Sequence, residues 1–292
     1  MCQATLGYRV LPVFIAAGLL AASTTSVVTA GQRGDWRAYA ADKAGTKYAP
    51  LDQINATNVN ALEIVWRQST IPNETRQGNT IDPPSGSQNT PLMVNGLLYI
   101  MTALGQVTAL DATTGEVVWF DSRPASDTEE AQRTFAARGV AYWEDNEEDD
   151  ARILAVLGSR LVALNPKTGE RYPDFGDGGE VDLIQGYDDR TVDSFRWRSA
   201  PLVVNDVIVI GSVIGDITSH TMPALKEMPP GDVRGFDVRT GEQLWIFHTI
   251  AREGEPGNET WLTRPDEDRA SWEYTGNTNM WASPSADEEL GY

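Results

Sequence analysis

The chain has 292 residues, with 42 acidic residues against 23 Lys and Arg, and its formal net charge is −19 at pH 7. Such an acidic surface argues against nucleic acid and against anionic membrane surfaces as partners. The one cysteine, Cys2, excludes a fold stapled by intramolecular disulfides.

The first 30 residues have the pattern of a secretory signal peptide. Arg9 supplies the positive charge, residues 10–22 are apolar, and residues 28–30 (Val-Thr-Ala) fit a small-x-small cleavage site. The apolar stretch is shorter than the about 20 residues of a membrane-spanning helix. We therefore expect residues 1–30 to be a signal peptide that sends the protein to the periplasm, with an uncleaved inner-membrane anchor as the alternative.

Residues 34–60 are polar and rich in turn residues, and they predict a leader segment. Residues 61–66 (ALEIVW) then resemble a short strand that ends in Trp66. This strand has no turn or partner strand beside it in the sequence. We expect it to be an orphan outer strand of the kind that closes a ring of sheets.

One phrase recurs along the rest of the chain. It reads ALDATTGEVVW at residues 109–119, ALNPKTGE at 163–170 and GFDVRTGEQLW at 235–245. Asp or Asn bonds the backbone of its own turn, and Gly takes the left-handed conformation without a Cβ penalty. Each copy therefore predicts a hairpin, and the Trp that follows in two copies is expected to pack against a neighbouring unit.

A second repeated element sets the phase of the units. TPLMVNGLLYI at residues 90–100 matches APLVVNDVIVI at 200–210, and both predict a strand, a tight turn and a strand. Four-stranded units are expected over 90–119 and 200–245, with strands of a middle unit near 153–157 and 160–164. Repeats of this size indicate an all-β fold, a β-propeller, with about three blades present.

A further copy of the second element begins at residue 283, and the sequence stops inside it at Tyr292. We interpret residues 31–292 as the N-terminal part of a propeller that is truncated inside a blade. The polar stretches 171–192, 216–232 and 251–279 are expected to be loops or insertions. The acidic run at residues 144–150 is interpreted as a solvated loop between strands, within a linker after the first unit, with a calcium loop as the weaker alternative.

Three motifs accompany the repeat: Gly-Asp-Trp at residues 34–36, Arg-Gly-Val-Ala-Tyr at 138–142 and Asn-x-Trp at 279–281. With the repeat and these motifs, the chain resembles the pyrroloquinoline-quinone (PQQ) dependent dehydrogenases. The resemblance covers residues 31–292. It implies a periplasmic eight-bladed propeller that oxidises sugars, polyols or alcohols by hydride transfer to PQQ, with calcium or magnesium and with a quinone or cytochrome as electron acceptor.

The resemblance also carries over four site residues. Three residues match cofactor-binding positions. Gln88 would make a polar contact with the cofactor, Arg138 would bind the cofactor's oxygens through its guanidinium, and the indole of Trp281 would stack on the cofactor's ring. Asp216 matches a metal-ligating acid. The alternatives are a loop amide for Gln88, a surface ion pair for Arg138, a turn-capping acid for Asp216 and a blade-packing residue for Trp281. Trp66, Trp119 and Trp245 are assigned to blade packing.

Two departures limit the assignment. The alcohol-oxidising branch carries adjacent cysteines just before the Arg-Gly motif, and residues 134–137 (TFAA) contain none. This favours the sugar and polyol branch. That branch, however, often has a His in the turn before the first Ala-Leu-Asp, where this chain has Leu104. The catalytic base and the remaining metal ligands of the family lie in later blades, so no catalytic residue is assigned within the chain and the chain alone is expected to be inactive.

A non-catalytic propeller that acts as a binding or assembly scaffold is the alternative function, and a pseudo-enzyme is a third. The oligomeric state is not assigned.

Overall fold

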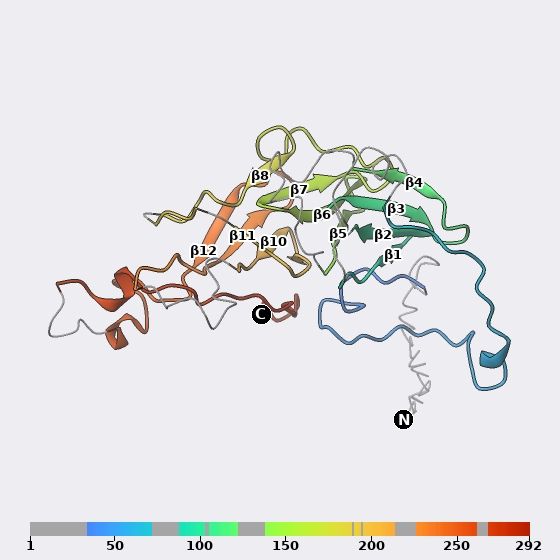
Figure 1. The fold of residues 1–292 in the computed structure, drawn as a ribbon, viewed down its shortest axis with the longest axis horizontal. Helices are drawn as coiled ribbons and strands as arrows, with labels where there is room; N and C mark the ends of the chain where they lie inside the picture. The colour runs from blue at the N-terminus through green and yellow to red at the C-terminus, as the bar shows by residue number, and fades with distance from the viewer. Residues whose placement is uncertain are drawn as a thin grey trace, which may run out of the picture.

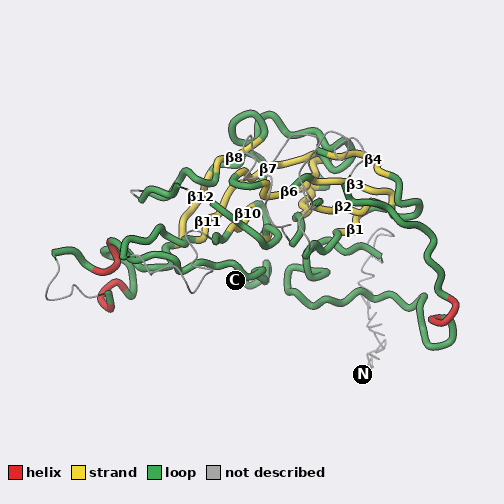
Figure 2. Tube along the Cα trace, viewed as in Figure 1, coloured by secondary structure: helices red, strands yellow, loops and turns green. Residues whose placement is uncertain are grey.

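The computed structural model describes residues 34–71, 88–102, 105–121, 138–188, 190–193, 195–213, 226–261 and 268–292. Their regular structure is almost entirely β: three four-stranded antiparallel sheets stand side by side like the blades of a fan (Figure 1). Figure 2 shows that long loops surround the sheets and that the 3-10 helices lie away from them. No helix among the described residues has the length and apolar character needed to cross a membrane.

Each sheet is a meander of neighbouring strands. Blade one contains β1 (Leu92–Val94), β2 (Leu97–Met101), β3 (Val107–Asp111) and β4 (Val117–Phe120); blade two contains β5 (Ala141–Asp145), β6 (Asp150–Leu157), β7 (Arg160–Leu164) and β8 (Glu180–Asp182); blade three contains β9 (Leu202–Val204), β10 (Val207–Ile210), β11 (Val233–Asp237) and β12 (Gln243–Phe247). The 3-10 helices are η2 (Val59–Ala61), η3 (Asn258–Thr260) and η4 (Ser271–Glu273). The predicted four-stranded units at residues 90–119 and 200–245 are confirmed.

The repeated turns form as their chemistry predicts. The Asp111 carboxylate accepts hydrogen bonds of 2.8 Å from the amides of Thr113 and Thr114, and these bonds hold the pKa of Asp111 below its ordinary range. Asn165 and Asp237 accept the equivalent pairs of amide hydrogen bonds in the other two copies. One side-chain oxygen thus fixes each turn between neighbouring strands.

Two tryptophans join successive units, as predicted. The indole of Trp66 lies on Gly115 and donates to the carbonyl of Ala112 at 3.3 Å. Trp119 lies in the same way on Gly169 of blade two and donates to Pro166 at 2.8 Å. A Cβ at either glycine would overlap the ring, so the repeated Gly serves both the left-handed turn and the contact between units. Trp245, in contrast, is 40% exposed and lies against Gly235 of its own sheet.

Replacing Gly169 by alanine is expected to destabilise the protein by about 2–5 kcal/mol, because a left-handed residue gains a Cβ and that Cβ displaces Trp119. Gly96 has a similar φ, +83° against +73°, with open space around its Cβ direction. Gly96→Ala is therefore the control: it measures the destabilisation from a Cβ in the left-handed backbone conformation, without a clash against an indole ring. The measurement is the free energy of urea unfolding. Equal losses in the two variants would show that the indole contact contributes nothing.

Two hydrophobic clusters fill the spaces between the blades, one between blades one and two and the other between blades two and three. Strand β6 supplies both clusters, because alternate side chains of a strand point to opposite faces. Ile153 and Ala155 belong to the first cluster, and Leu154 and Val156 belong to the second. A middle blade is buried on both faces, which explains why its sequence reads as a nearly continuous apolar run.

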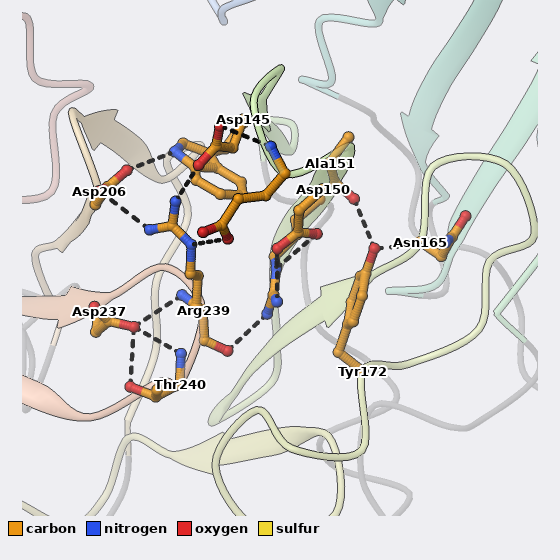
Figure 3. A network of polar contacts seen from close by, with 12 residues as sticks. Asp145, Asp150, Ala151, Asn165, Tyr172, Asp206, Asp237, Arg239 and Thr240 are labelled. Carbon is orange, nitrogen blue, oxygen red and sulfur yellow. Dashed lines mark hydrogen bonds and ion pairs between the residues drawn. The ribbon is translucent and has the colours of Figure 1, made fainter.

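The interpretation of the acidic run as a solvated loop between strands is confirmed, although the run lies inside blade two and not in a linker between blades. Residues 144–150 end β5, form a tight turn and begin β6. The guanidinium of Arg239, from blade three, pairs with Asp145 at 2.5 Å and with Asp206 at 3.1 Å, and it lies 4.5 Å from the ring centroid of Trp143. Figure 3 shows this cation between the two carboxylates. Its positive charge balances part of the run, so the turn is a junction between blades two and three.

Three other predictions differ from the structure. Residues 61–66 have no strand pairing among the described residues, although Trp66 makes its predicted contact. The stretch 171–192, predicted to be a loop, contains β8. Residues 283–292 form no strand and end in a turn in which Asp287 accepts two backbone amides. In each case the strand assignment depends on a partner distant in sequence, which local patterns do not reveal.

Candidate functional site

The site begins where the chain enters the innermost strand of each blade. The amide of Thr90, just before β1, donates to the carbonyl of Arg138 at 2.8 Å. The amide of Arg138, just before β5, donates in turn to the carbonyl of Arg198, before β9, at 2.7 Å. These two backbone hydrogen bonds fix the entry segments of three blades side by side.

Arg138 and Trp281 meet at this convergence, although 143 residues separate them. The Arg138 guanidinium carbon lies 5.7 Å from the ring centroid of Trp281, within the range of a cation–π contact. Nη1 of Arg138 donates to the Trp281 carbonyl at 3.4 Å. The side chain of Trp281 remains 55% exposed. The structure therefore presents a cation and an accessible aromatic plane at one place.

Ser199 links these two residues. Its hydroxyl is buried, donates to the Trp281 carbonyl at 2.8 Å and accepts from Arg138 Nη1 at 3.1 Å. The sequence interpretation missed Ser199. The repeat phase could have found it, because Ser199 immediately precedes the Ala-Pro-Leu element of blade three just as Asn89 precedes the Thr-Pro-Leu element of blade one.

The segment that leads to Trp281 is held against the end of β10. The amide of Ser212 donates to the Met280 carbonyl at 3.2 Å, and the Ser212 hydroxyl donates to Asn279 Oδ1 at 3.0 Å. A Cβ at Gly211 would overlap the Met280 carbonyl, so glycine at this position permits the close approach. Residue 281 is thus positioned by backbone contacts that do not depend on its own side chain.

The other two predicted site residues are less defined. Gln88 is exposed and lies two residues before Thr90, close in sequence to the convergence. Asp216 lies outside the described residues. Within the described ranges no group of three or more His, Cys, Asp or Glu side chains is arranged to hold a metal ion. The structure therefore brings together Arg138 and Trp281, and the prediction of Asp216 as a metal ligand stays a prediction.

The donors at the convergence suit a flat, anionic, aromatic ligand. A guanidinium offers a planar fork of N–H donors that matches carboxylate oxygens, and an exposed indole offers a stacking surface. The backbone of both residues is tied to neighbouring blades, so their side chains are held in place before a ligand arrives. The residues present therefore fit an aromatic polycarboxylate such as PQQ.

Comparison with known proteins agrees with this arrangement. Residues 36–292 match the family described as "PQQ: Glucose/ethanol/alcohol dehydrogenase, beta-propeller domain". The chain is 29% identical to quinoprotein glucose dehydrogenase A of Acinetobacter calcoaceticus, over 91% of the chain and 33% of that protein. It is 31% identical to quinate/shikimate dehydrogenase (quinone) of Acinetobacter baylyi, over 88% of the chain and 32% of that protein.

A similar solved structure is quinohemoprotein alcohol dehydrogenase ADHIIG of Pseudomonas putida HK5, with a TM-score of 0.64 and 27% identity over 89% of the chain and 34% of that protein. The chain thus spans about a third of the length of these relatives. The family match covers all three blades and both residues of the Arg138–Trp281 pair. The chain belongs to the PQQ-dependent glucose/ethanol/alcohol dehydrogenase β-propeller family.

Proposed function

We propose that the protein oxidises a sugar, polyol or other alcohol with PQQ as its cofactor, and that the convergence at Arg138 and Trp281 forms part of the cofactor site. The observation that carries the proposal is this pair, a guanidinium 5.7 Å from an exposed indole, held by the buried Ser199. Relatives named for glucose, for quinate and shikimate, and for glycerol support the substrate class.

PQQ, when bound, supplies an electrophilic quinone that accepts hydride from the substrate's carbinol carbon. Arg138 would bind and orient the cofactor's oxygens, and Trp281 would present its ring as a platform that fixes the cofactor plane. Ser199 would hold Arg138 and Trp281 in position relative to each other, because its hydroxyl is hydrogen-bonded to both residues. Gln88, an exposed amide that can donate and accept, would add a polar contact at the rim.

The metal and the electron acceptor belong to the same proposal. We assign calcium or magnesium as the metal and Asp216 as one of its ligands, because carboxylate oxygen is the donor that these cations prefer. The electrons would pass to a quinone or a cytochrome. No residue of this sequence is proposed to accept the substrate's hydroxyl proton. We further propose that residues 1–30 direct the protein to the periplasm, on the pattern of Arg9, the apolar stretch and the Val-Thr-Ala site.

The proposal is tested on protein expressed from its complete reading frame and stripped of cofactor and metal. PQQ is titrated in the presence of calcium, magnesium or a chelator while tryptophan fluorescence is recorded. Aldoses, polyols and primary alcohols are then supplied with an artificial redox dye. We expect saturable quenching and dye reduction that require both PQQ and a divalent cation. Absence of saturable PQQ binding with either cation would contradict the proposal.

A further inference from the structure

A histidine held between two carboxylates lies beside the segment that carries Trp281. His248 directly follows β12, and its side chain is only 11% exposed. Its Nδ1 lies 2.7 Å from a carboxylate oxygen of Glu255, and its Nε2 lies 2.9 Å from a carboxylate oxygen of Asp188. One imidazole therefore joins two loops, the one after β8 and the one after β12.

This geometry favours the charged form of the ring. A neutral imidazole has one N–H donor, so one of its nitrogens would present a lone pair to a carboxylate. The imidazolium donates from both nitrogens and satisfies both acids. Burial favours the neutral ring, but the hydrogen bonds to Glu255 and Asp188 outweigh burial and raise the pKa of His248 above its ordinary value.

Other charged groups face the same ring. Asp232, at the end of the segment that enters β11, is almost fully buried, and burial raises its pKa despite a backbone hydrogen bond from Thr249. Its negative charge favours the imidazolium, whereas Arg252, 3.8 Å from Asp232, opposes it. Arg190 acts on Asp232 in the same sense as Arg252. The acids facing His248 outnumber the cations, so the surroundings as a whole favour the protonated ring.

Thr249, the residue after His248, contacts the segment that leads to Trp281. The amide of Thr249 donates to Asp232 at 3.0 Å, and its hydroxyl lies 2.6 Å from the hydroxyl of Thr278, three residues before Trp281. A Cβ at Gly231 would lie 2.9 Å from the Asn279 amide nitrogen, so the two segments are in close contact there. Thr249, next to His248 in the chain, therefore contacts the segment that ends in Trp281.

We propose that His248 is a proton-dependent clasp: as imidazolium it fastens Glu255 to Asp188, and through Thr249 it positions the Trp281 segment. The link to cofactor affinity rests on the proposed function; the clasp itself does not. Because the folded-state pKa is raised, the clasp's contribution to stability is complete below the unfolded-state pKa of about 6.5. It is lost as pH rises through the folded-state pKa. The loop at residues 251–258 then loosens.

The first test needs no cofactor. Histidine ring NMR is recorded against pH in a His220→Asn background, which leaves His248 as the reporter. Hydrogen exchange of residues 250–258 and 275–281 is compared between His248→Gln and the parent at each pH. We expect a titration midpoint above about 6.5 and protection in the parent that exceeds the variant's at low pH. The excess should disappear as pH rises past that midpoint.

Two further variants keep the test decisive. Asp188→Asn changes a half-exposed partner and should lower the His248 pKa without unfolding the protein. Glu253→Gln removes an exposed acid from the same loop and should change neither readout. A midpoint at or below about 6.5, or equal protection in parent and His248→Gln at every pH, would overturn the clasp. PQQ affinity that falls with rising pH in the parent and is flat in His248→Gln would establish the link to Trp281. The same pH slope in both would remove it.

Discussion

Replacement of Arg138 by alanine is expected to weaken PQQ binding by about 10- to 100-fold, because a hydrogen bond to a charged group contributes about 1.5–3 kcal/mol. The variant should stay folded. The backbone hydrogen bonds between blades at this position use the amide and carbonyl of Arg138, which alanine keeps; alanine loses only the Nη1 hydrogen bonds to Ser199 and Trp281. The measurement is the dissociation constant for PQQ from fluorescence quenching, with thermal unfolding recorded beside it.

Two controls separate a cofactor contact from a structural effect. Arg138→Lys keeps the charge but loses the planar fork, so an intermediate affinity is expected. Arg160→Ala removes an arginine from β7, where it pairs with Glu180 and Asp182 on the neighbouring strand, and should leave PQQ affinity unchanged. Unchanged affinity in Arg138→Ala would remove Arg138 from the cofactor site and leave Trp281 as the residue to test.

The parts of the fold that sequence predicts are those encoded within a few residues. The repeated turn depends on Asp111, Asn165 or Asp237 bonding amides two and three residues ahead, and all three do so. Gly169 is the turn glycine of one copy of the repeat, and Trp119 follows the turn of the copy before it. The contact between them therefore follows from the spacing of the repeated motif. Turn chemistry and repeat spacing therefore determined the unit length and the order of strands.

Features that depend on distant partners could not be predicted in this way. The acidic turn after β5 is polar in sequence, yet Arg239 neutralises part of it from another blade. Strand β8 is three residues long and lies in a loop-like stretch, and its pairing with β7 defines it. Local composition correctly indicates an exposed loop at the acidic turn but does not reveal its ion pairs with Arg239, and it indicates a loop where β8 forms. Tertiary contacts determine the result.

The candidate site shows the same division. No spacing rule connects Arg138 with Trp281 across 143 residues, and their joint assignment came from family resemblance. The structure adds what resemblance could not supply, namely that Ser199 bonds both residues and that backbone contacts hold their segments. Arg138 lies in the entry segment of blade two, and Trp281 lies on a segment held against the end of β10 in blade three, so the site depends on these blades being packed correctly against each other.

The packing of blade two against blade three can be tested directly through Arg234. Among the described residues of these two blades, Arg234 is the most buried charged side chain. Arg234, on β11, is 1% exposed and donates to the carbonyls of Leu183 at 2.7 Å and Gln185 at 2.5 Å. Its guanidinium carbon lies 4.0 Å from the ring centroid of Tyr187. Burial lowers the pKa of Arg234. Carbonyl dipoles and an aromatic face thus stabilise a cation that has no carboxylate hydrogen-bonded to it among the described residues.

Arg234→Ala is expected to destabilise the protein by about 3–5 kcal/mol, because it leaves the buried Leu183 carbonyl and the partly buried Gln185 carbonyl without their donor and opens a cavity between the blades. Arg234→Met refills much of the volume and should recover the cavity part of the loss. Arg160, whose side chain is 40% exposed, forms two surface ion pairs, so Arg160→Ala should cost less than about 1 kcal/mol. Urea unfolding measures all three variants. A loss in Arg234→Ala no larger than that in Arg160→Ala would show that the buried guanidinium does not hold these blades together.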